Sequence, residues 1–310
     1  MGEFTAVFTG GTGRSGTTVL AKMLRCHRQI RASRPLEVRC VTDAAGVCDL
    51  CVGVRADGPW RLRVLARAPW LLEREFQRRF RGHWWMRENR LGKTSGLHRG
   101  MTQAQREQIL ANFAATLRID RMRAGRELVA DIAHAQGLQS ERYWIDTSPP
   151  NIANADRIHA LIPDARFVHM VRDGKDTMAS VLQEKWGPTD AEAAARWWAE
   201  RMTAAHRALS EVPEHLVMTV SLESLVVTDR QEQYQRVLDF FELSDRDRMH
   251  RYFAEQMPAE RVRPGSWAER VSDPARLERA YEKAAKRLVA AGIPTHEFPR
   301  PPDAFPPESG

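Results

Sequence analysis

Short runs of apolar residues, each followed by a turn and a helical pattern, occur at two places along the chain. The first run begins at Val7 and ends in a group of glycines, after which a helix is predicted. The second run covers residues 167–171 and precedes a predicted helix over 173–184. Continuous apolar runs of this length are typical of buried parallel strands. We therefore predict an α/β fold with a central, mostly parallel sheet flanked by helices.

Helical patterns fill much of the remaining sequence. Thr102 followed by Gln105 forms a capping-box pattern, which predicts a helix that runs to about residue 118. Residues 69–81 predict an amphipathic helix whose polar side is nearly all arginine. An alanine-rich helix over 190–210 carries Trp197 and Trp198, which cannot both face the same neighbour. Further helices are predicted over 126–136 and 274–291.

The glycine-rich turn after the first strand predicts a phosphate site. Glycine occupies positions 10, 11, 13 and 16, where it lets the backbone approach a ligand while the first amides of the next helix lack partners. The common nucleotide triphosphatase loop carries a lysine that reaches the outer phosphates. Here Thr17 holds that position, and the cation, Arg14, lies three residues upstream. A glycine-rich turn that binds no ligand is the alternative.

Arg172 and Ser180 predict a second phosphate contact. Arg172 follows the strand over 167–171, at the carboxyl end where open α/β sheets bind ligands. Ser180 lies two helical turns further on, so a ligand that contacts both must lie along this helix. Alone, such an arginine is more often a surface ion pair. Together with the glycine-rich loop, the two residues indicate two phosphate sites on one nucleotide.

At these residues the chain resembles the PAPS-dependent sulfotransferases of the bacterial branch, where PAPS is 3′-phosphoadenosine 5′-phosphosulfate. The loop 13–18 resembles the 5′-phosphosulfate loop, and 171–180 resembles the 3′-phosphate motif. Residues 217–226 and a helix over 231–241 are similar to the elements that close the family's sheet, and 261–267 resemble its late nucleotide loop. The resemblance spans about residues 4–293 and is weakest between 41 and 141. It implies a nucleotide site formed by Gly13, Arg14, Ser15, Gly16, Thr17, Thr18, Arg172, Ser180, Arg263 and Gly265.

The resemblance also implies a reaction, in-line transfer of the sulfonyl group of PAPS to a hydroxyl, without a metal. Negative charge grows mainly on the leaving 5′-phosphate, so Arg14, the loop amides and the Thr17 and Thr18 hydroxyls are expected to stabilise it. Because arginine does not give up a proton, Arg14 is an electrostatic clamp and not an acid. The expected acceptor is a hydroxylated small molecule, glycolipid or carbohydrate.

Glu37, in an E-x-R context with Arg39, is the candidate base. Family branches that act on carbohydrates and protein tyrosines place a glutamate near this position. A glutamate with an ordinary pKa is a poor base for an alcohol, so a desolvated pocket would have to raise its pKa. A loop salt bridge is the alternative role for Glu37, and His27 is the rival base. Many relatives carry lysine where this chain has Thr147, and Arg90 and Lys93 are candidates to replace that cation.

The chain of 310 residues is long enough for one sizeable α/β core. We expect a single domain over 1–293, in which 41–141 form a variable, mostly helical region on the acceptor side. A proline-rich tail covers 294–310. No apolar stretch of about 18 residues occurs, and the sequence shows no secretory signal. The expected location is the cytoplasm.

Positive charge is concentrated in one basic aromatic segment, residues 60–93. It contains ten Arg and Lys against three acids, and this surplus equals the formal charge of +7 for the whole chain. Its aromatic residues and cations suit an anionic, glycosylated or lipid-bearing acceptor, or an anionic membrane surface. The alternative is that arginine-rich helices pack their aromatic side on the core. Nucleic acid is not the expected partner because no nucleic-acid module accompanies the segment.

Four cysteines leave several states open. Cys48 and Cys51 form a C-x-x-C pattern, whereas Cys26 and Cys40 are far apart in sequence. Structural zinc usually needs two close pairs, so reduced thiols are expected, with a Cys48–Cys51 redox pair as an alternative. Two other functions stay open for the whole chain, a P-loop phosphotransferase that uses ATP and magnesium and a non-catalytic nucleotide-binding protein.

Overall fold

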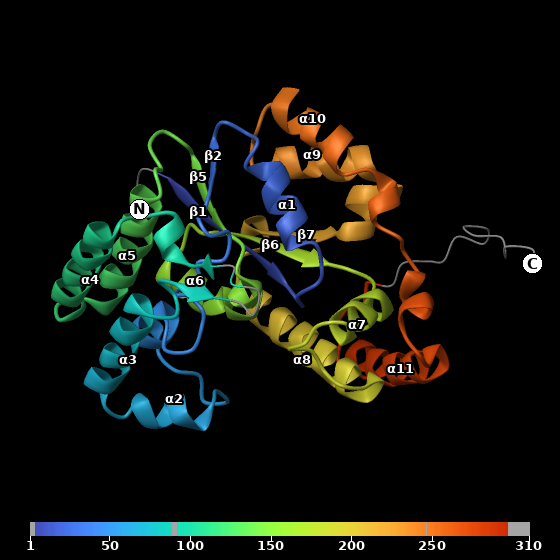
Figure 1. The fold of residues 1–310 in the computed structure, drawn as a ribbon, viewed down its shortest axis with the longest axis horizontal. Helices are drawn as coiled ribbons and strands as arrows, with labels where there is room; N and C mark the ends of the chain where they lie inside the picture. Colours follow the sequence, from blue (N-terminus) through green and yellow to red (C-terminus); the bar gives the residue numbers. More distant parts are fainter. Residues whose placement is uncertain (1–3, 89–91, 93, 246, 297–310) are drawn as a thin grey trace, which may run out of the picture. The chain divides into compact units, whose positions relative to one another are not determined.

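The computed structural model describes residues 4–88, 92, 94–245 and 247–296. Its centre is a parallel sheet of five strands in the order β2-β5-β1-β6-β7, flanked by helices (Figure 1). The predicted α/β fold is confirmed. The strands are β1 (Thr5–Gly11), β2 (Ile30–Ala32), β5 (Tyr143–Asp146), β6 (Arg166–Val171) and β7 (Val217–Ser221).

The middle of the sheet is buried, as the apolar runs predict. All four residues of β5 are buried, and β5 pairs in parallel with both β1 and β2. Tyr143 lies opposite Thr5 on one side and Ile30 on the other. Parallel strands end at the same edge of a sheet, so Gly11, Asp146 and Val171 all lead into loops where such folds bind ligands.

The chain divides into two compact units, and the first consists of Met1–Gly10, Thr17–His169 and Arg207–Met218. It includes the variable region 41–141, where α4 and α5 pack against each other. A two-stranded antiparallel sheet, β3 (Arg87–Glu88) with β4 (Thr94–Ser95), was not predicted. The helices of this unit are α1 (Thr17–Leu24), α2 (Trp60–Leu65), α3 (Pro69–Arg81), α4 (Gln103–Leu117), α5 (Arg121–Ala135) and α6 (Ala155–Leu161).

The second unit consists of Gly11–Gly16, Met170–His206 and Thr219–Gly310. In its core, α7 packs against α11. The centres of the Trp198 and Tyr281 rings are 5.0 Å apart. The helices of this unit are α7 (Gly174–Leu182), most of α8 (Ala191–Leu209), α9 (Arg230–Phe240), α10 (Asp247–Gln256) and α11 (Pro274–Ala290).

Helix starts follow the predicted signals with one exception. The capping box is present, since the Gln105 amide donates to Thr102 Oγ1 and the Gln105 side chain accepts from the Thr102 amide. Helix α5 begins at Arg121, five residues before the predicted start, because Asp120 caps it. Gly125 then lies inside the helix, where a Cβ would come within 2.7 Å of Leu161. This glycine allows close packing and does not mark a boundary.

Some predictions concern parts of the chain that the structure does not describe. Arg90, Lys93 and the tail from residue 297 onward lie outside the described residues. Within the described part of the chain, no helix combines the length and apolar character that a membrane crossing requires.

Candidate functional site

The loop Gly11–Gly16 connects β1 to α1 and has the tight backbone that its glycines predict. Gly13 and Gly16 have φ of +86° and +91°. A Cβ on Gly16 would lie 2.7 Å from Leu222, and one on Gly11 would lie 2.2 Å from the carbonyl oxygen of Met170. Arg14 also adopts a left-handed conformation, with φ of +62°. The loop is therefore a close-packed turn that holds Arg14 at its tip.

Arg14 links the two predicted phosphate motifs. Its Nε donates a hydrogen bond to Ser180 Oγ at 3.1 Å, although the two residues are 166 positions apart. Its Nη1 forms an ion pair with Glu184 Oε1 at 3.0 Å. Arg172 Nη1 in turn donates to the main-chain carbonyl of Arg14 at 3.2 Å. We call Arg14, Ser15, Arg172, Ser180 and Glu184 the phosphate cluster.

Arg172 is a largely buried cation with spare hydrogen-bonding capacity. Its side chain is 11% exposed, and Glu223 Oε1 is 3.8 Å from its Nε. Within the described part of the chain this Nε makes no hydrogen bond, and neither does the buried hydroxyl of Ser15. Burial lowers the pKa of Arg172 and raises that of Glu223. Buried donors without acceptors are costly, and the oxygens of a phosphate would satisfy them.

Glu223 and Asp176 are residues of this region that the sequence analysis missed. Glu223 accepts the Asp173 amide at 3.1 Å, which fixes the start of α7. Asp176 is fully buried, and burial raises its pKa. Asp176 is in the first turn of α7, four residues after Arg172. Glu223 lies in the segment 217–226, which resembles an element that closes the family's sheet. The spacing of Asp176 from Arg172 along a helix, and the resemblance of the segment that contains Glu223, were the signals that could have pointed to these two residues.

The late loop is held against α7 through Gly265. This glycine has φ of +77°, and its amide donates to Asp176 Oδ2 at 2.8 Å. Arg263 is placed differently. Its guanidinium forms a 2.8 Å ion pair with Glu269, and both side chains are more than half exposed. The structure thus brings Gly265 to the helix that carries Ser180, whereas the Arg263 side chain pairs at the surface.

Two neighbouring tryptophans of α8 face different surroundings, as predicted. Trp198 is buried in the core of the second unit. Trp197 is partly buried, and a Cβ on Gly13 would lie 3.8 Å from its ring. The Arg201 guanidinium lies 4.1 Å from the centre of the Trp197 ring. Trp197 therefore faces the phosphate loop.

Thr17 and Thr18 are the first two residues of α1. Thr17 is partly buried and Thr18 is exposed. The first amides of a helix have no partner within it. Both hydroxyls are therefore near unpaired main-chain donors, at the end of the helix where an anion is favoured.

Glu37, the candidate base, lies on a turn fastened to the end of β5. Its Oε2 accepts from Arg39 Nε at 3.2 Å, and both side chains are about one third exposed. The Thr147 amide and hydroxyl both donate to the Leu36 carbonyl, at 2.9 and 3.0 Å. The Glu37–Arg39 salt bridge that was the alternative is thus present. Thr147, at the position of the family's lysine, supports this turn.

Asp146 anchors the same turn from inside the protein. Its buried carboxylate accepts four hydrogen bonds, from the Val38 amide, the Ser148 amide and hydroxyl, and Asn151 Nδ2. The Ser148 hydroxyl also accepts from the Arg39 amide at 2.9 Å. Burial outweighs these donors and raises the pKa of Asp146 to about 6. We call residues 36–39 with Asp146 and Ser148 the Glu37 turn.

His27, the rival base, has a structural role. It is 2% exposed, and its Nδ1 accepts the Gln29 amide at 3.2 Å in the segment that leads to β2. An Nδ1 used in this way favours the tautomer with a proton on Nε2. His27 lies three residues beyond the end of α1 and is packed in the interior.

The cysteines are free thiols. Cys40, Cys48 and Cys51 are buried, and Cys26 is partly buried. Burial raises the pKa of Cys48 and of Cys51 to about 12. Because thiolate is the reactive form, both are poor nucleophiles at neutral pH. Within the described residues, no group of three or more His, Cys, Asp or Glu is placed to hold a metal ion.

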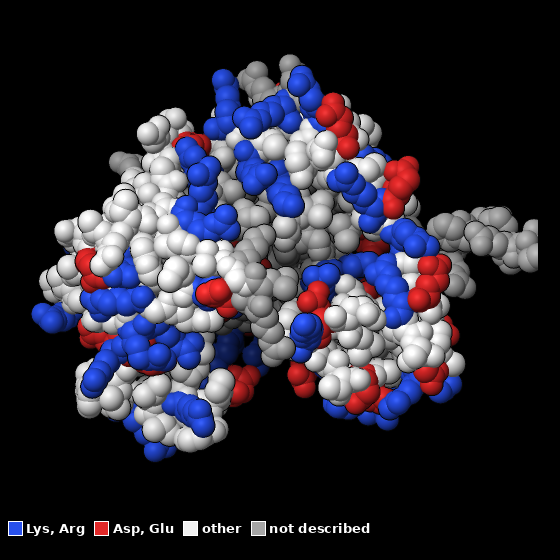
Figure 2. Space-filling model, in the orientation of Figure 1, with Lys and Arg blue, Asp and Glu red and all other residues white. Residues whose placement is uncertain are grey.

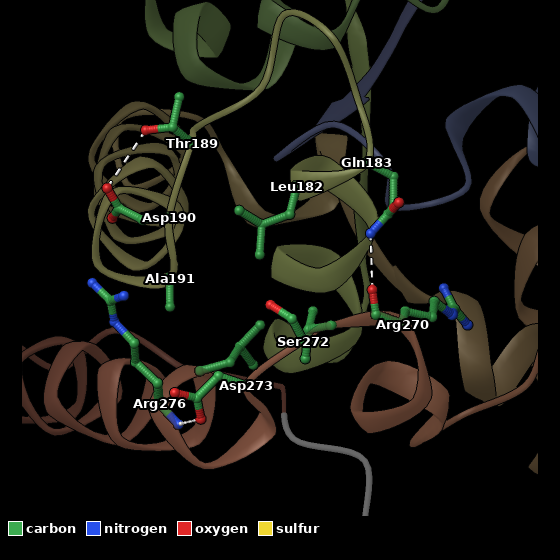
Figure 3. Close-up of a pocket in the computed structure, with 11 residues that line it drawn as sticks. Leu182, Gln183, Thr189, Asp190, Ala191, Arg270, Ser272, Asp273 and Arg276 are labelled. Atoms are coloured by element: carbon green, nitrogen blue, oxygen red, sulfur yellow. Dashed lines mark hydrogen bonds between the residues drawn. The ribbon is translucent and has the colours of Figure 1, made fainter.

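A pocket of about 380 Å³ lies in the second unit, between the end of α7 and the starts of α8 and α11 (Figure 3). At one side of it Gln183 donates to the Arg270 carbonyl at 2.8 Å, and Asp273 caps α11. None of the predicted site residues is among those that line the pocket. Its lining residues are Leu182, Gln183, Thr189, Asp190, Ala191, Arg270, Val271, Ser272, Asp273, Arg276 and Leu277.

Similar structures come from several bacteria. The sulfotransferase STF9 from Mycobacterium avium superimposes with a TM-score of 0.53 at 13% identity, covering 96% of this chain and 79% of that one. The sulfotransferase STF1 from Mycobacterium tuberculosis H37Rv superimposes with a TM-score of 0.51 at 15% identity, covering 93% of this chain and 77% of that one. The sulfotransferase domain of the Synechococcus PCC 7002 olefin synthase gives 0.50 at 15% identity, covering 92% and 94%. At such identities these likenesses concern the fold.

Comparison of the sequence itself assigns the family. No curated protein sequence matches the chain. The model of the sulfotransferase family matches residues 66–247, which is more than half of the chain and includes Arg172, Ser180 and Glu223. The glycine-rich loop lies before the matched residues, so the loop and the family match are independent observations. The chain belongs to the sulfotransferase family.

Proposed function

We propose that the protein transfers the sulfonyl group of PAPS to a hydroxyl of a small-molecule, glycolipid or carbohydrate acceptor. One observation carries the proposal: Arg14, Arg172 and Ser180 meet in a cluster. In this cluster the buried Ser15 Oγ and Arg172 Nε have no hydrogen-bond partner among the described residues. Two phosphate motifs that meet in this way fit a nucleotide with two phosphate groups.

The residues present fit PAPS. The loop amides, Ser15, Thr17 and Thr18 would hold the 5′-phosphosulfate, and Arg172 with Ser180 would hold the 3′-phosphate. Gly265 would bring the late loop over the nucleotide, and Arg263 would reach it only after leaving Glu269. PAPS supplies the sulfonyl group and a phosphate as the leaving group. Arg14 would then leave Ser180 and Glu184 and stabilise the charge on the departing phosphate.

Glu37 is the proposed base. A bond forms between the acceptor oxygen and sulfur while the bond between sulfur and the phosphate oxygen breaks, and the acceptor's proton passes to the Glu37 carboxylate. The Glu37 turn fixes the backbone on both sides of this residue through Asp146, Thr147 and Ser148. Arg39 would have to leave Glu37 when the acceptor binds, because its Nε occupies the Glu37 Oε2 that would accept the proton.

The two rival functions have less support. A phosphotransferase with ATP and magnesium needs the loop lysine and a carboxylate for the metal. Thr17 replaces the lysine, and the buried carboxylate at the end of β5, Asp146, already accepts four hydrogen bonds. A non-catalytic nucleotide-binding protein would keep the phosphate cluster without needing Glu37.

Thermal stabilisation by nucleotides tests the proposal. The matched ligands are 3′,5′-adenosine bisphosphate (PAP) and AMP, which differ only in the 3′-phosphate, with ATP plus magnesium as the third. At about 100 times its dissociation constant, PAP should add about 2.7 kcal/mol to the free energy of unfolding. Stabilisation by PAP that AMP does not match, followed by release of PAP from PAPS when acceptors are added, supports a sulfotransferase. Stabilisation only by ATP with magnesium would contradict it, and PAP binding without turnover would favour the binding protein.

A further inference from the structure

An exposed apolar and cationic surface lies in the first unit. Residues 59–72, which we call the α2–α3 surface, consist of three arginines and eleven apolar residues, with no other polar or acidic residue. Of the apolar side chains, only Leu62 and Leu72 are buried. Trp60, Val64 and Trp70 are 64%, 50% and 63% exposed. Large exposed apolar groups gathered in one segment indicate an interaction site.

The core behind this surface does not include its two tryptophans. Leu72, Phe76 and Phe80 form the buried face of α3, and the Phe76 ring lies 5.6 Å from Trp84 and 4.9 Å from Phe113. The prediction that arginine-rich helices pack aromatic residues on the core is therefore correct for α3. Trp60 and Trp70 are not part of that packing, so their exposure needs another explanation.

The charges of the surface lack internal partners. Among the described residues, no carboxylate forms an ion pair with Arg61, Arg63 or Arg67, or with the neighbouring exposed Arg74. Glu75 is already held by Arg78 and Arg79 at 2.6 and 2.7 Å, and this pairing lowers its pKa to about 2. Figure 2 shows Lys and Arg side chains crowded at the lower left, where Figure 1 places α2 and α3. The surface presents unneutralised positive charge beside its tryptophans.

We propose that the α2–α3 surface binds the face of a membrane that contains anionic lipids. Arginines complement anionic headgroups. Tryptophan is the side chain that prefers the boundary between headgroups and acyl chains, and short amphipathic helices with this composition lie in that plane. Nucleic acid fits less well, because its phosphates and sugars are usually also contacted by Ser, Thr, Asn, Gln or Lys, none of which occurs in 59–72.

Flotation of the full-length protein with vesicles tests this proposal. The wild type should float with vesicles of phosphatidylglycerol and phosphatidylcholine but not with pure phosphatidylcholine, and added salt should weaken binding. The triple variant R61Q/R63Q/R67Q should bind roughly 100-fold less tightly, on the basis of each charge's usual attraction to such surfaces. The variant W60S/W70S should lose binding to a similar degree although it keeps every charge.

A matched control separates a specific surface from net charge. The variant R279Q/K283Q/R287Q removes three exposed cations from α11, in the other unit, and should bind vesicles as the wild type does. Hydrogen exchange of the wild type should show protection of 59–72 by anionic vesicles, a readout that does not depend on variants folding. Equal loss in the control, unchanged binding of W60S/W70S, or preference for a nucleic-acid duplex or for self-association through 59–72 would overturn the proposal. PAP-dependent stabilisation should be the same in all variants.

Discussion

The phosphate cluster and the Glu37 turn are both polar, but they use their polar groups in opposite ways. In the phosphate cluster, Ser15 Oγ and Arg172 Nε are buried donors that make no hydrogen bond within the described chain. In the Glu37 turn, the Asp146 carboxylate accepts four hydrogen bonds. Buried donors that make no hydrogen bond reduce stability unless a ligand accepts hydrogen bonds from them. Under the proposed function, a bound phosphate would satisfy the donors of the first region, whereas the second region holds a backbone in place.

This difference predicts what substitutions should do. Changes in the phosphate cluster should alter ligand binding or turnover with little loss of stability, because the cluster contributes few satisfied contacts. Changes that remove the anchor of the Glu37 turn should reduce stability and change its pH dependence. A result that reverses this pattern would show that the roles of the two regions have been confused.

Arg14→Ala should have the largest effect. Removing one preorganised donor from a developing anion costs about 3–4 kcal/mol of the barrier, or roughly a 100- to 1,000-fold loss of kcat. The free energy of unfolding should change by less than about 1 kcal/mol, because the Arg14–Glu184 pair is partly exposed. The assay is release of PAP from PAPS with an acceptor, beside denaturant unfolding. Arg14→Lys keeps the charge and should retain much of the activity; an Ala variant as active as the wild type would remove Arg14 from catalysis.

Asp146→Asn tests the other side of the comparison. The folded-state pKa of Asp146, about 6, is above the ordinary 3.8, so the folded state binds the proton more tightly. This contribution to stability is present below the ordinary pKa and is lost as pH rises from about 3.8 to about 6. A shift of about two pKa units corresponds to about 3 kcal/mol.

The measurement is denaturant unfolding of wild type and Asp146→Asn across this pH range. As pH rises, the free energy of unfolding of the wild type should fall by about 3 kcal/mol relative to that of the variant, because Asn does not titrate. Asp176 and Glu223, whose pKa values burial also raises, are common to both proteins and cancel in the difference. Parallel pH curves for the two proteins would show that Asp146 does not titrate in this range.

The sequence predicted the α/β fold because the strands and the turns next to them depend on local patterns. Strand β6, the helix after it and the turn Gly11–Gly16 are specified by apolar runs and glycines next to them in the chain. The predicted start of α5 is five residues late because Asp120 caps the helix and Gly125 lies inside it. The close approach of Gly125 to Leu161 depends on residues distant in sequence.

The partners of Arg14 could not be predicted. Glu184 and Ser180 are 170 and 166 positions away, and only the folded sheet brings α7 to the loop. The same holds for Asp146, which the sequence analysis did not single out although it ends a buried strand. An aspartate at a strand end can bind a metal, cap a turn or lie exposed, and only the donors around it show that it anchors residues 36–39. Likewise, composition alone does not predict that Trp60 and Trp70 are exposed.

Arg172→Ala sharpens the distinction within the proposed nucleotide site. Hydrogen bonds to a charged group contribute about 1.5–3 kcal/mol, so PAP should bind roughly 10- to 100-fold more weakly, by calorimetry. AMP, which lacks the 3′-phosphate, should bind the variant and the wild type about equally. The matched control is Arg263→Ala, whose side chain pairs with Glu269 at the surface, and its effect on PAP should be smaller. An equal loss for AMP and PAP would place Arg172 elsewhere on the nucleotide.

Glu184→Gln should have the smallest effect, and its direction is informative. Glu184 holds Arg14 at 3.0 Å in the free protein, with the two side chains 30% and 44% exposed. A nucleotide phosphate must compete with this carboxylate for Arg14, and partly exposed pairs contribute about 0.2–1 kcal/mol. Removing the negative charge should therefore tighten PAP binding by up to about fivefold. Glu192→Gln, which removes an exposed partner of Arg276, should leave PAP affinity unchanged. Weaker binding by Glu184→Gln would mean that Glu184 orients Arg14 toward the nucleotide, and the cluster would then be arranged before the ligand arrives.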